Sequence, residues 1–244
     1  MSKLSKIRDG NFTSSEVVAL TKNGKKSGEF GAPFYTYIKQ CNQERKLGKS
    51  LDSDLSARPT VWGSFVEKWL MFERPDIIGI EYTLSPQSTI QHPQYDYWVG
   101  SRDGLNNSTG AIIDIKCPFT LGSFCNFADC KTIEEVRENH KDGDKYYWQL
   151  VSNAHIAGTN KAELIIFVPN YEQVKEIQEF AVMGDHENLN QLYFIGNAID
   201  GDLPYISEDS FYKNLIKFEF EIPQEDLDFL ENRVIEAGKL LWQK

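Results

Sequence analysis

Two aspartates and a lysine lie around a turn-like segment near the middle of the chain. Asp103 precedes the polar stretch 106–110, and Asp114 and Lys116 follow it within a run of isoleucines. Because side chains alternate along a strand, Asp114 and Lys116 would share one face. Carboxylates inside a buried strand are costly without a partner, and hard oxygen ligands suit Mg²⁺ or Mn²⁺. The pattern therefore predicts a divalent-cation site, although from the spacing alone a solvated strand face is the more common arrangement.

A β-hairpin is the element expected to bring these residues together. Residues 95–99 and 111–115 are rich in aromatic and β-branched side chains, and turn-forming residues lie between them. A turn in the middle of the polar stretch would place Asp103 opposite Ile112 and diagonal to Asp114. Diagonal neighbours on one face lie within about 7–8 Å of each other, so both carboxylates could reach one ion.

The arrangement resembles the core of the PD-(D/E)XK nuclease superfamily, in which an acid, a hairpin and an Asp/Glu-x-Lys strand occur in this order. Residues 101–105 (Ser-x-Asp-Gly-Leu) and 114–120 (Asp-Ile-Lys-Cys-Pro-Phe-Thr) resemble one branch, bacteriophage lambda exonuclease and its YqaJ-like viral recombinase relatives. The resemblance implies an α/β fold with a mixed central sheet flanked by helices. It implies one nuclease domain over 1–244, with a motif-bearing core at about 8–168 and a C-terminal decoration at about 184–244.

The resemblance also implies a group of oxygen ligands for Mg²⁺, with Mn²⁺ as a substitute. These ligands would be Asp103, Asp114, the Ile115 carbonyl and Glu67. Glu67 follows a Trp-Gly pair as in the family motif, whereas without that motif a helix-surface glutamate is the simpler interpretation. Asp114 stands where this branch usually has Glu, so its side chain, one methylene shorter, leaves the metal spacing open.

Two further residues would take part in hydrolysis. Lys116 would orient or help to deprotonate the attacking water, with its pKa lowered by the metal charge. Gln149, on a helix expected at 145–158 that ends at a glycine, resembles the glutamine that contacts the scissile region in this branch. On its own, a glutamine on a helix is simply polar surface.

A phosphate-binding group is expected near the N-terminus. A hydroxyl residue at position 13 or 14 would cap a helix over about 15–22, and the free N–H groups of a helix N-terminus attract phosphate. An ordinary capped surface helix is the simpler interpretation of these residues. In the family motif an Arg and a Ser seven residues later bind the terminal phosphate of DNA, which implies Arg8 and Ser15 here, with Ser101 as a further phosphate contact.

Hydrophobic spacing predicts the elements around this core. Helices are expected at 33–45, 60–72, 132–140, 145–158 and 224–242. Strands are expected at 77–84, 162–168, 174–183 and 218–222, the last of them at a sheet edge. Residues 184–212 show no clear period and match no motif.

The formal net charge of −10 is unusual for a protein that binds DNA. The charge is unevenly distributed, because residues 1–60 carry 11 lysines and arginines against 6 acids and residues 151–244 carry 7 against 17. The basic N-terminal quarter is therefore expected to face a polyanion. A trimeric ring, which the resemblance implies, would reconcile an acidic exterior with a basic bore.

Targeting and redox signals are sparse. The chain lacks both an 18-residue apolar run and an apolar signal region, so we expect no membrane span and a cytoplasmic location in a bacterium or phage-infected cell. The four cysteines form no C-x-x-C pair, which indicates reduced thiols rather than an iron–sulfur cluster.

The acids and the lysine predict a Mg²⁺-dependent nuclease, and the resemblance implies an exonuclease that degrades duplex DNA with free ends, from 5′ to 3′, in phage-type recombination. A single-strand annealing protein is the partner that the resemblance implies. Three alternatives stay open: an endonuclease or repair nuclease of the same superfamily, a DNA-binding relative that has lost catalysis, and an acidic module that binds no nucleic acid. The complete set of motif residues argues against the second, and only the net charge supports the third.

Overall fold

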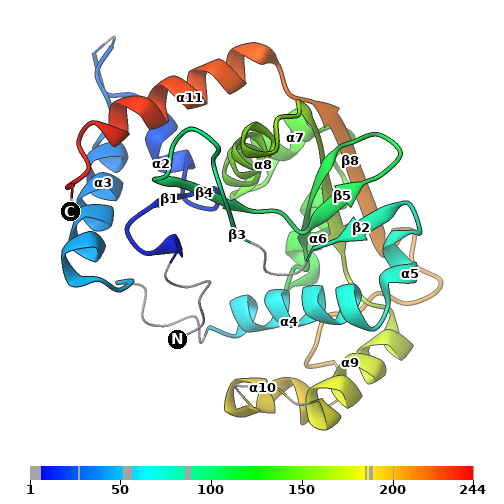
Figure 1. The fold of residues 1–244 in the computed structure, drawn as a ribbon. Coiled ribbons are helices and arrows are strands. Elements are labelled where there is room, and N and C mark those ends of the chain that lie inside the picture. Colours follow the sequence, from blue (N-terminus) through cyan, green and yellow to red (C-terminus); the bar gives the residue numbers. More distant parts are fainter. Residues whose placement is uncertain are drawn as a thin grey trace.

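Two β-sheets with helices packed around them form a mixed α/β architecture, as expected (Figure 1). The computed structural model describes residues 7–26, 28–51, 57–85, 89–184, 186, 189–199 and 201–243. In this part of the chain, no helix combines the length and the apolar character needed to cross a membrane.

The larger sheet has five strands. Their order is β2 (Tyr82–Leu84), β5 (Gly104–Asn106), β6 (Ile112–Lys116), β7 (Lys161–Phe167) and β8 (Leu215–Glu221). Strands β6 and β7 are parallel, and the other neighbours are antiparallel. A parallel pair needs a long crossover, and here it includes helix α8 (Gly143–Ala157). Strand β8 lies at the edge of the sheet, as predicted.

The smaller sheet corrects the predicted hairpin. It consists of β1 (Phe12–Thr13), β4 (Trp98–Ser101) and β3 (Thr89–Gln91), with β4 in the centre. The aromatic run expected to pair with residues 111–115 therefore belongs to another sheet. The hairpin partner of β6 is the short strand β5, and the chain passes from one sheet to the other at Arg102 and Asp103.

The register of the hairpin also differs from the prediction. Gly104 pairs with Ile113, so Asp103 lies opposite Asp114 instead of opposite Ile112. The physical reason is the side chain of Asn106, whose Oδ1 accepts the N–H groups of two turn residues, at 2.9 and 3.3 Å, and moves the turn toward the C-terminus. The two aspartates are therefore closer neighbours than the sequence suggested.

Five predicted helices are present. They are α3 (Ala32–Leu47), α4 (Arg58–Phe72), α7 (Ile133–Asn139), α8 and α11 (Gln224–Gly238). Helix α8 ends at Gly158, whose φ of 70° suits a residue without a Cβ atom. A short helix, α6 (Leu121–Ala128), precedes α7.

Four other assignments were wrong or incomplete. Residues 174–183 are not a strand but part of helix α9 (Tyr171–Met183), which begins with a capping box between Asn170 and Gln173. Residues 77–84 comprise the end of helix α5 (Pro75–Ile78) and strand β2. Helix α10 (Leu189–Gly196) lies in the segment without a clear period. The predicted helix over 15–22 shortens to α2 (Val18–Thr21).

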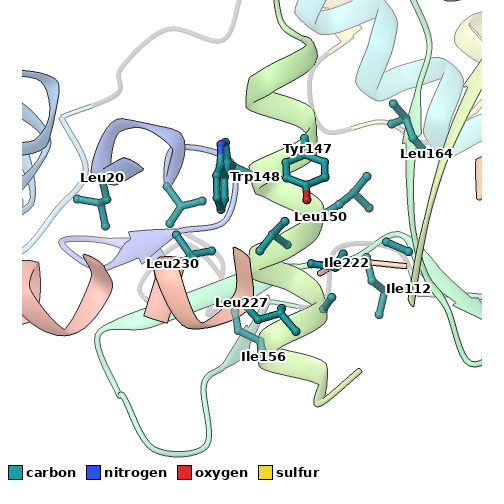
Figure 2. Close-up of a cluster of buried hydrophobic side chains, with 14 of the residues drawn as sticks. Leu20, Ile112, Tyr147, Trp148, Leu150, Ile156, Leu164, Ile222, Leu227 and Leu230 are labelled. Carbon is teal, nitrogen blue, oxygen red and sulfur yellow. The ribbon is translucent and has the colours of Figure 1, made fainter. Parts of the chain in front are cut away.

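Strand β6 is buried on both faces. Ile112 faces a core shared with α8 and α11, and Figure 2 shows Leu227 and Leu230 of α11 beside Leu150 of α8 in this core. Ile113 and Ile115 face a second core, to which helices α4 and α9 contribute. The alternation predicted for this strand is confirmed, and it explains why Asp114 is fully buried.

Candidate active site

A pocket of about 160 Å³ is lined by residues from both sheets and from helices α4 and α8. It brings together every side chain that the sequence predicts for the site, namely Arg8, Ser15, Glu67, Ser101, Asp103, Asp114, Lys116 and Gln149. The remaining lining residues are Thr13, Ser14, Thr89, Val99 and Gly100. Acidic residues and hydroxyl residues thus share one cavity.

Asp114 is the central acid of the pocket. Gln149 Nε2 donates a hydrogen bond to Asp114 Oδ1 at 2.7 Å, which holds the carboxylate from the side of α8. Lys116 Nζ lies 2.5 Å from Asp114 Oδ2. Lys116 is therefore the cationic partner of this buried carboxylate oxygen.

Asp103 stands where the chain crosses between the sheets. Its Oδ2 atom accepts the backbone N–H of Ile115 at 2.6 Å, and its own N–H donates to the carbonyl of Ile113. Because N–H and C=O of one strand residue point to the same side, the Ile115 carbonyl faces the side on which β5 has ended. Ile115 itself is not among the residues that line the pocket, so the role predicted for its carbonyl stays a prediction.

The acid cluster consists of Glu67, Asp103 and Asp114 together with Lys116. Burial and mutual charge shift the pKa values of three of these groups. Burial raises the pKa of Asp103 well above its ordinary value, and the charges of Glu67 and Asp114 add to the effect. Burial also raises the pKa of Glu67 to about 7, against the opposing charge of Lys116. Burial acts to lower the pKa of Lys116, but the three carboxylates outweigh it and the pKa is raised. Without a cation, Asp103 and Glu67 hold their protons to a higher pH than free carboxyl groups do, and Lys116 retains its charge.

The donor set fits a hard divalent cation. It supplies three carboxylate groups against one lysine, and one of their oxygens, Asp114 Oδ2, contacts that lysine. Among the described residues, however, no three His, Cys, Asp or Glu side chains stand ready to bind one ion. A cation would have to displace Lys116 Nζ from Asp114.

A second part of the pocket lining consists of one arginine and several hydroxyl groups. We call it the hydroxyl wall, and it comprises Arg8, Thr13, Ser15, Thr89 and Ser101. Arg8 Nη2 donates to Ser15 Oγ at 3.4 Å, and Thr13 Oγ1 lies 3.2 Å from the same oxygen. Ser101 Oγ lies 3.0 Å from Thr89 Oγ1. A cation surrounded by hydroxyl donors suits a phosphate group.

The structure corrects how this group is positioned. Helix α2 begins at Val18, after Ser15, and its N-cap residue Val17 carries no capping hydroxyl. The N-terminus of a helix therefore does not build the site. Strand β1, which ends at Thr13 beside β4, positions the hydroxyls instead.

Helix α8 ties the two parts of the pocket together. Ser152 Oγ lies 2.7 Å from Ser14 Oγ and accepts a hydrogen bond from Trp98 Nε1 at 2.8 Å. Asn153 Nδ2 donates to the Ser101 carbonyl at 3.0 Å. Since Gln149 precedes these residues by three and four positions, one helix face holds both the acid and the hydroxyl wall.

Several residues of this arrangement were not predicted from the sequence. Thr89 lines the pocket, and Ser152 and Asn153 support it, yet none of them matches a motif, and Thr13 was expected only as a helix cap. The one available signal was polar residues three and four positions after Gln149 in a helix whose other residues are mostly apolar.

Comparisons with known proteins add the fold family. The sequence matches no family model and no curated protein. The alkaline exonuclease LHK-Exo from Laribacter hongkongensis has a similar structure (TM-score 0.61, 16% identity, covering 98% of this chain and 92% of that one).

Two further crystal structures are comparably similar. LHK-Exo in complex with dAMP gives a TM-score of 0.62 at 15% identity, again covering 98% of this chain and 92% of that one. A phage-related exonuclease from Haemophilus somnus 129PT gives 0.61 at 14% identity and covers 94% and 92%. The chain therefore has the fold of the alkaline and phage-related exonucleases, and the resemblance inferred from its sequence is confirmed at the level of the fold.

Proposed function

We propose that this protein is a metal-dependent deoxyribonuclease that removes nucleotides from the ends of duplex DNA. The observation that carries the proposal is the shared pocket, in which the acid cluster around Asp114 and the hydroxyl wall around Ser15 lie within one cavity of about 160 Å³. The exonuclease activity named for structures of the same fold supports the same conclusion.

Hydrolysis of a phosphodiester requires an oriented water and positive charge on the phosphate. A divalent cation, Mg²⁺ or Mn²⁺, held by Asp103, Asp114, the Ile115 carbonyl and Glu67 would supply Lewis acidity. Gln149 orients Asp114 through its hydrogen bond to Oδ1. Lys116 is protonated while the carboxylates surround it. Once freed from Asp114, its ammonium group would hold the water or the phosphate. Lys116 could release its own proton, and so act as a base, only after the carboxylate charge is offset.

The hydroxyl wall would bind the phosphate at the end of the strand. Arg8, Ser15 and Ser101 are the proposed ligands, and they share the pocket with the acid cluster, so a bound terminal phosphate would lie close to the bond that is cleaved. This arrangement favours release of short products, and the 5′-to-3′ direction rests on the family resemblance. The dAMP in the LHK-Exo complex is a mononucleotide, the kind of product that such a site would hold.

Other parts of the proposal rest on the family resemblance. They are assembly into a trimeric ring, cooperation with a single-strand annealing protein, and a role in phage-type recombination in the cytoplasm of a bacterial or infected cell. An acidic exterior around a more basic bore agrees with the uneven charge of the sequence.

The test uses linear duplex DNA with 5′ phosphates, with Mg²⁺ or EDTA, beside a covalently closed circular duplex. We expect metal-dependent shortening of the linear DNA, with Asp114→Asn losing at least about 100-fold in rate, the order of effect of removing a transition-state contact. Loss of circular DNA would indicate an endonuclease. DNA binding without cleavage under either metal would indicate a relative that has lost catalysis, and the absence of both would contradict the proposal.

A further inference from the structure

A chain of hydroxyl groups leads from the protein interior into the pocket. It starts at Tyr37 of α3, which is 7% exposed and packs its ring against Phe12 with centroids 5.6 Å apart. The Tyr37 oxygen lies 3.3 Å from Thr13 Oγ1, which lies 3.2 Å from Ser15 Oγ. Arg8 Nη2 reaches the same Ser15 oxygen at 3.4 Å. Tyr37 itself does not line the pocket, so it can act on a ligand only through Thr13 and Ser15.

In the first step of the chain, the distance between the two hydroxyl oxygens allows either of them to donate, and the other contacts of Tyr37 favour one direction. The phenol oxygen of Tyr37 accepts the backbone N–H of Thr13 at 2.8 Å. Among the described residues, its own proton has two acceptors within reach, the Thr13 hydroxyl and the sulfur of Cys41. A thiol sulfur is a weak acceptor and a buried O–H group donates wherever it can. Donation from Tyr37 to Thr13 is therefore the favoured direction.

The direction then carries through to the pocket. Thr13 accepts from Tyr37, and its own proton is directed to Ser15, the other hydroxyl within reach. The Ser15 oxygen accepts from Thr13 and from Arg8, so the Ser15 proton is left to point into the cavity. Hydrogen bonds in such a chain polarise one another, which strengthens the last donor.

We propose that Tyr37 is a positioning residue that turns the Ser15 hydroxyl into a donor for the terminal phosphate of DNA. A phosphate oxygen only accepts hydrogen bonds, whereas a hydroxyl end of DNA both donates and accepts. A Ser15 group fixed as a donor therefore discriminates in favour of phosphorylated ends. The inference rests on the proposed function, because it assumes that the hydroxyl wall binds this phosphate.

The test compares binding of two duplex oligonucleotides that differ in a 5′-phosphate or 5′-hydroxyl end, by fluorescence anisotropy in EDTA. Tyr37→Phe keeps the ring in the core and should lower the ratio of the two affinities by about two- to tenfold, the range for one hydrogen bond. Tyr35→Phe is the matched control, because Tyr35 lies on the same helix, is 54% exposed and takes no part in the chain. Its ratio should equal that of the wild type.

Thr13 provides the second arm. Thr13→Val should lower the ratio as Tyr37→Phe does, and Thr13→Ser should restore it. The double variant Tyr37→Phe/Thr13→Val should be no worse than either single variant, because both break the same chain. Additive losses would mean that the two residues act separately and would overturn the inference. The ratio is measured within each variant, so a partly unfolded sample lowers both affinities and leaves it unchanged.

The outcomes separate this inference from the proposed function. A wild-type protein that binds both ends equally overturns the inference even if it cleaves DNA. A ratio that falls only in the Tyr37 and Thr13→Val variants supports the inference even in a protein that cleaves no DNA.

Discussion

At the scale of single residues, the sequence was most informative where chemistry requires a particular side chain. Acids and a lysine at motif spacing could be assigned in advance, because a buried strand tolerates Asp114 and Lys116 only for a reason. The supporting residues could not be assigned in this way. Ser152 and Asn153 look like ordinary helix residues until the neighbours of α8 are known, and Thr89 gains its place only when β3 pairs with β4.

His92 gives a prediction about pH and stability. Its ring is 7% exposed, stacks on Trp98 with centroids 4.8 Å apart, and lies 3.1 Å from the ring of His155, which in turn lies 3.7 Å from Glu231. Burial lowers the pKa of His92 below its ordinary value, the charge of His155 lowers it further, and Glu231 opposes both. The unfolded chain therefore binds this proton more readily than the folded one, so the contribution to stability is present above the unfolded pKa and is lost on acidification.

We expect wild-type protein to lose more free energy of unfolding between about pH 7.5 and 5.5 than His92→Asn, as measured by urea denaturation. The Asn oxygen can replace the ring nitrogen that accepts the N–H groups of Gln94 and Tyr95. The carboxylates of the pocket titrate in both proteins, so their effect on the free energy of unfolding cancels in the comparison. Equal losses in the two proteins would count against the assignment.

At the scale of elements, patterns predicted most helices but not the pairing of strands. The register of the β5–β6 hairpin depends on the Asn106 side chain, which hydrophobic spacing does not report. Segment 174–183 was assigned to a strand, and the capping residues Asn170 and Gln173 before it were the overlooked sign of a helix. Separation of the chain into two sheets had no local signal at all.

The packing of α8 on β4 yields a prediction at this scale. A Cβ atom on Gly100 would clash with Asn153 Oδ1 and lie 2.6 Å from Ser14 Oγ, so an added methyl group would force these hydrogen-bonded side chains to move. Gly100→Ala should cost about 1–3 kcal/mol of unfolding free energy and reduce DNA cleavage, because it pushes α8 away from the pocket.

The matched control for Gly100→Ala is Gly122→Ala. Gly122 lies in helix α6 and a Cβ atom there meets nothing within 4 Å. This substitution should be neutral or stabilise by up to about 1 kcal/mol. Equal denaturation midpoints for the two variants would contradict the packing argument.

At the scale of the whole molecule, the basic N-terminal region is less available to DNA than its composition suggested. Lys22 pairs with Asp144 at 2.7 Å, and Arg45 donates to backbone carbonyls of the N-terminal and C-terminal segments. The cations that line the pocket are Arg8 and Lys116. Net charge counted along a sequence cannot reveal such internal pairing, because the partners lie far apart in the chain.

Salt dependence should report this charge distribution. Two phosphate contacts predict that DNA binding weakens by about tenfold between 50 and 200 mM salt, and Arg8→Gln should reduce the slope of log K against log salt by about one. Binding isotherms at four or five salt concentrations would measure it. A loss of about a thousandfold would require several further basic contacts and would point to a DNA path outside the pocket.

The crossing between the sheets has a further consequence. Ser101 is the last residue of β4, and Asp103 directly precedes β5, so one residue joins the hydroxyl wall to the acid cluster. Two peptide units hold the corresponding Cα atoms within about 7 Å of each other. In an enzyme of the proposed kind, this covalent link would hold the phosphate-binding residues at a fixed distance from the residues that cleave the DNA. The size of each released fragment would then depend on the backbone of the protein and not on the base sequence of the DNA.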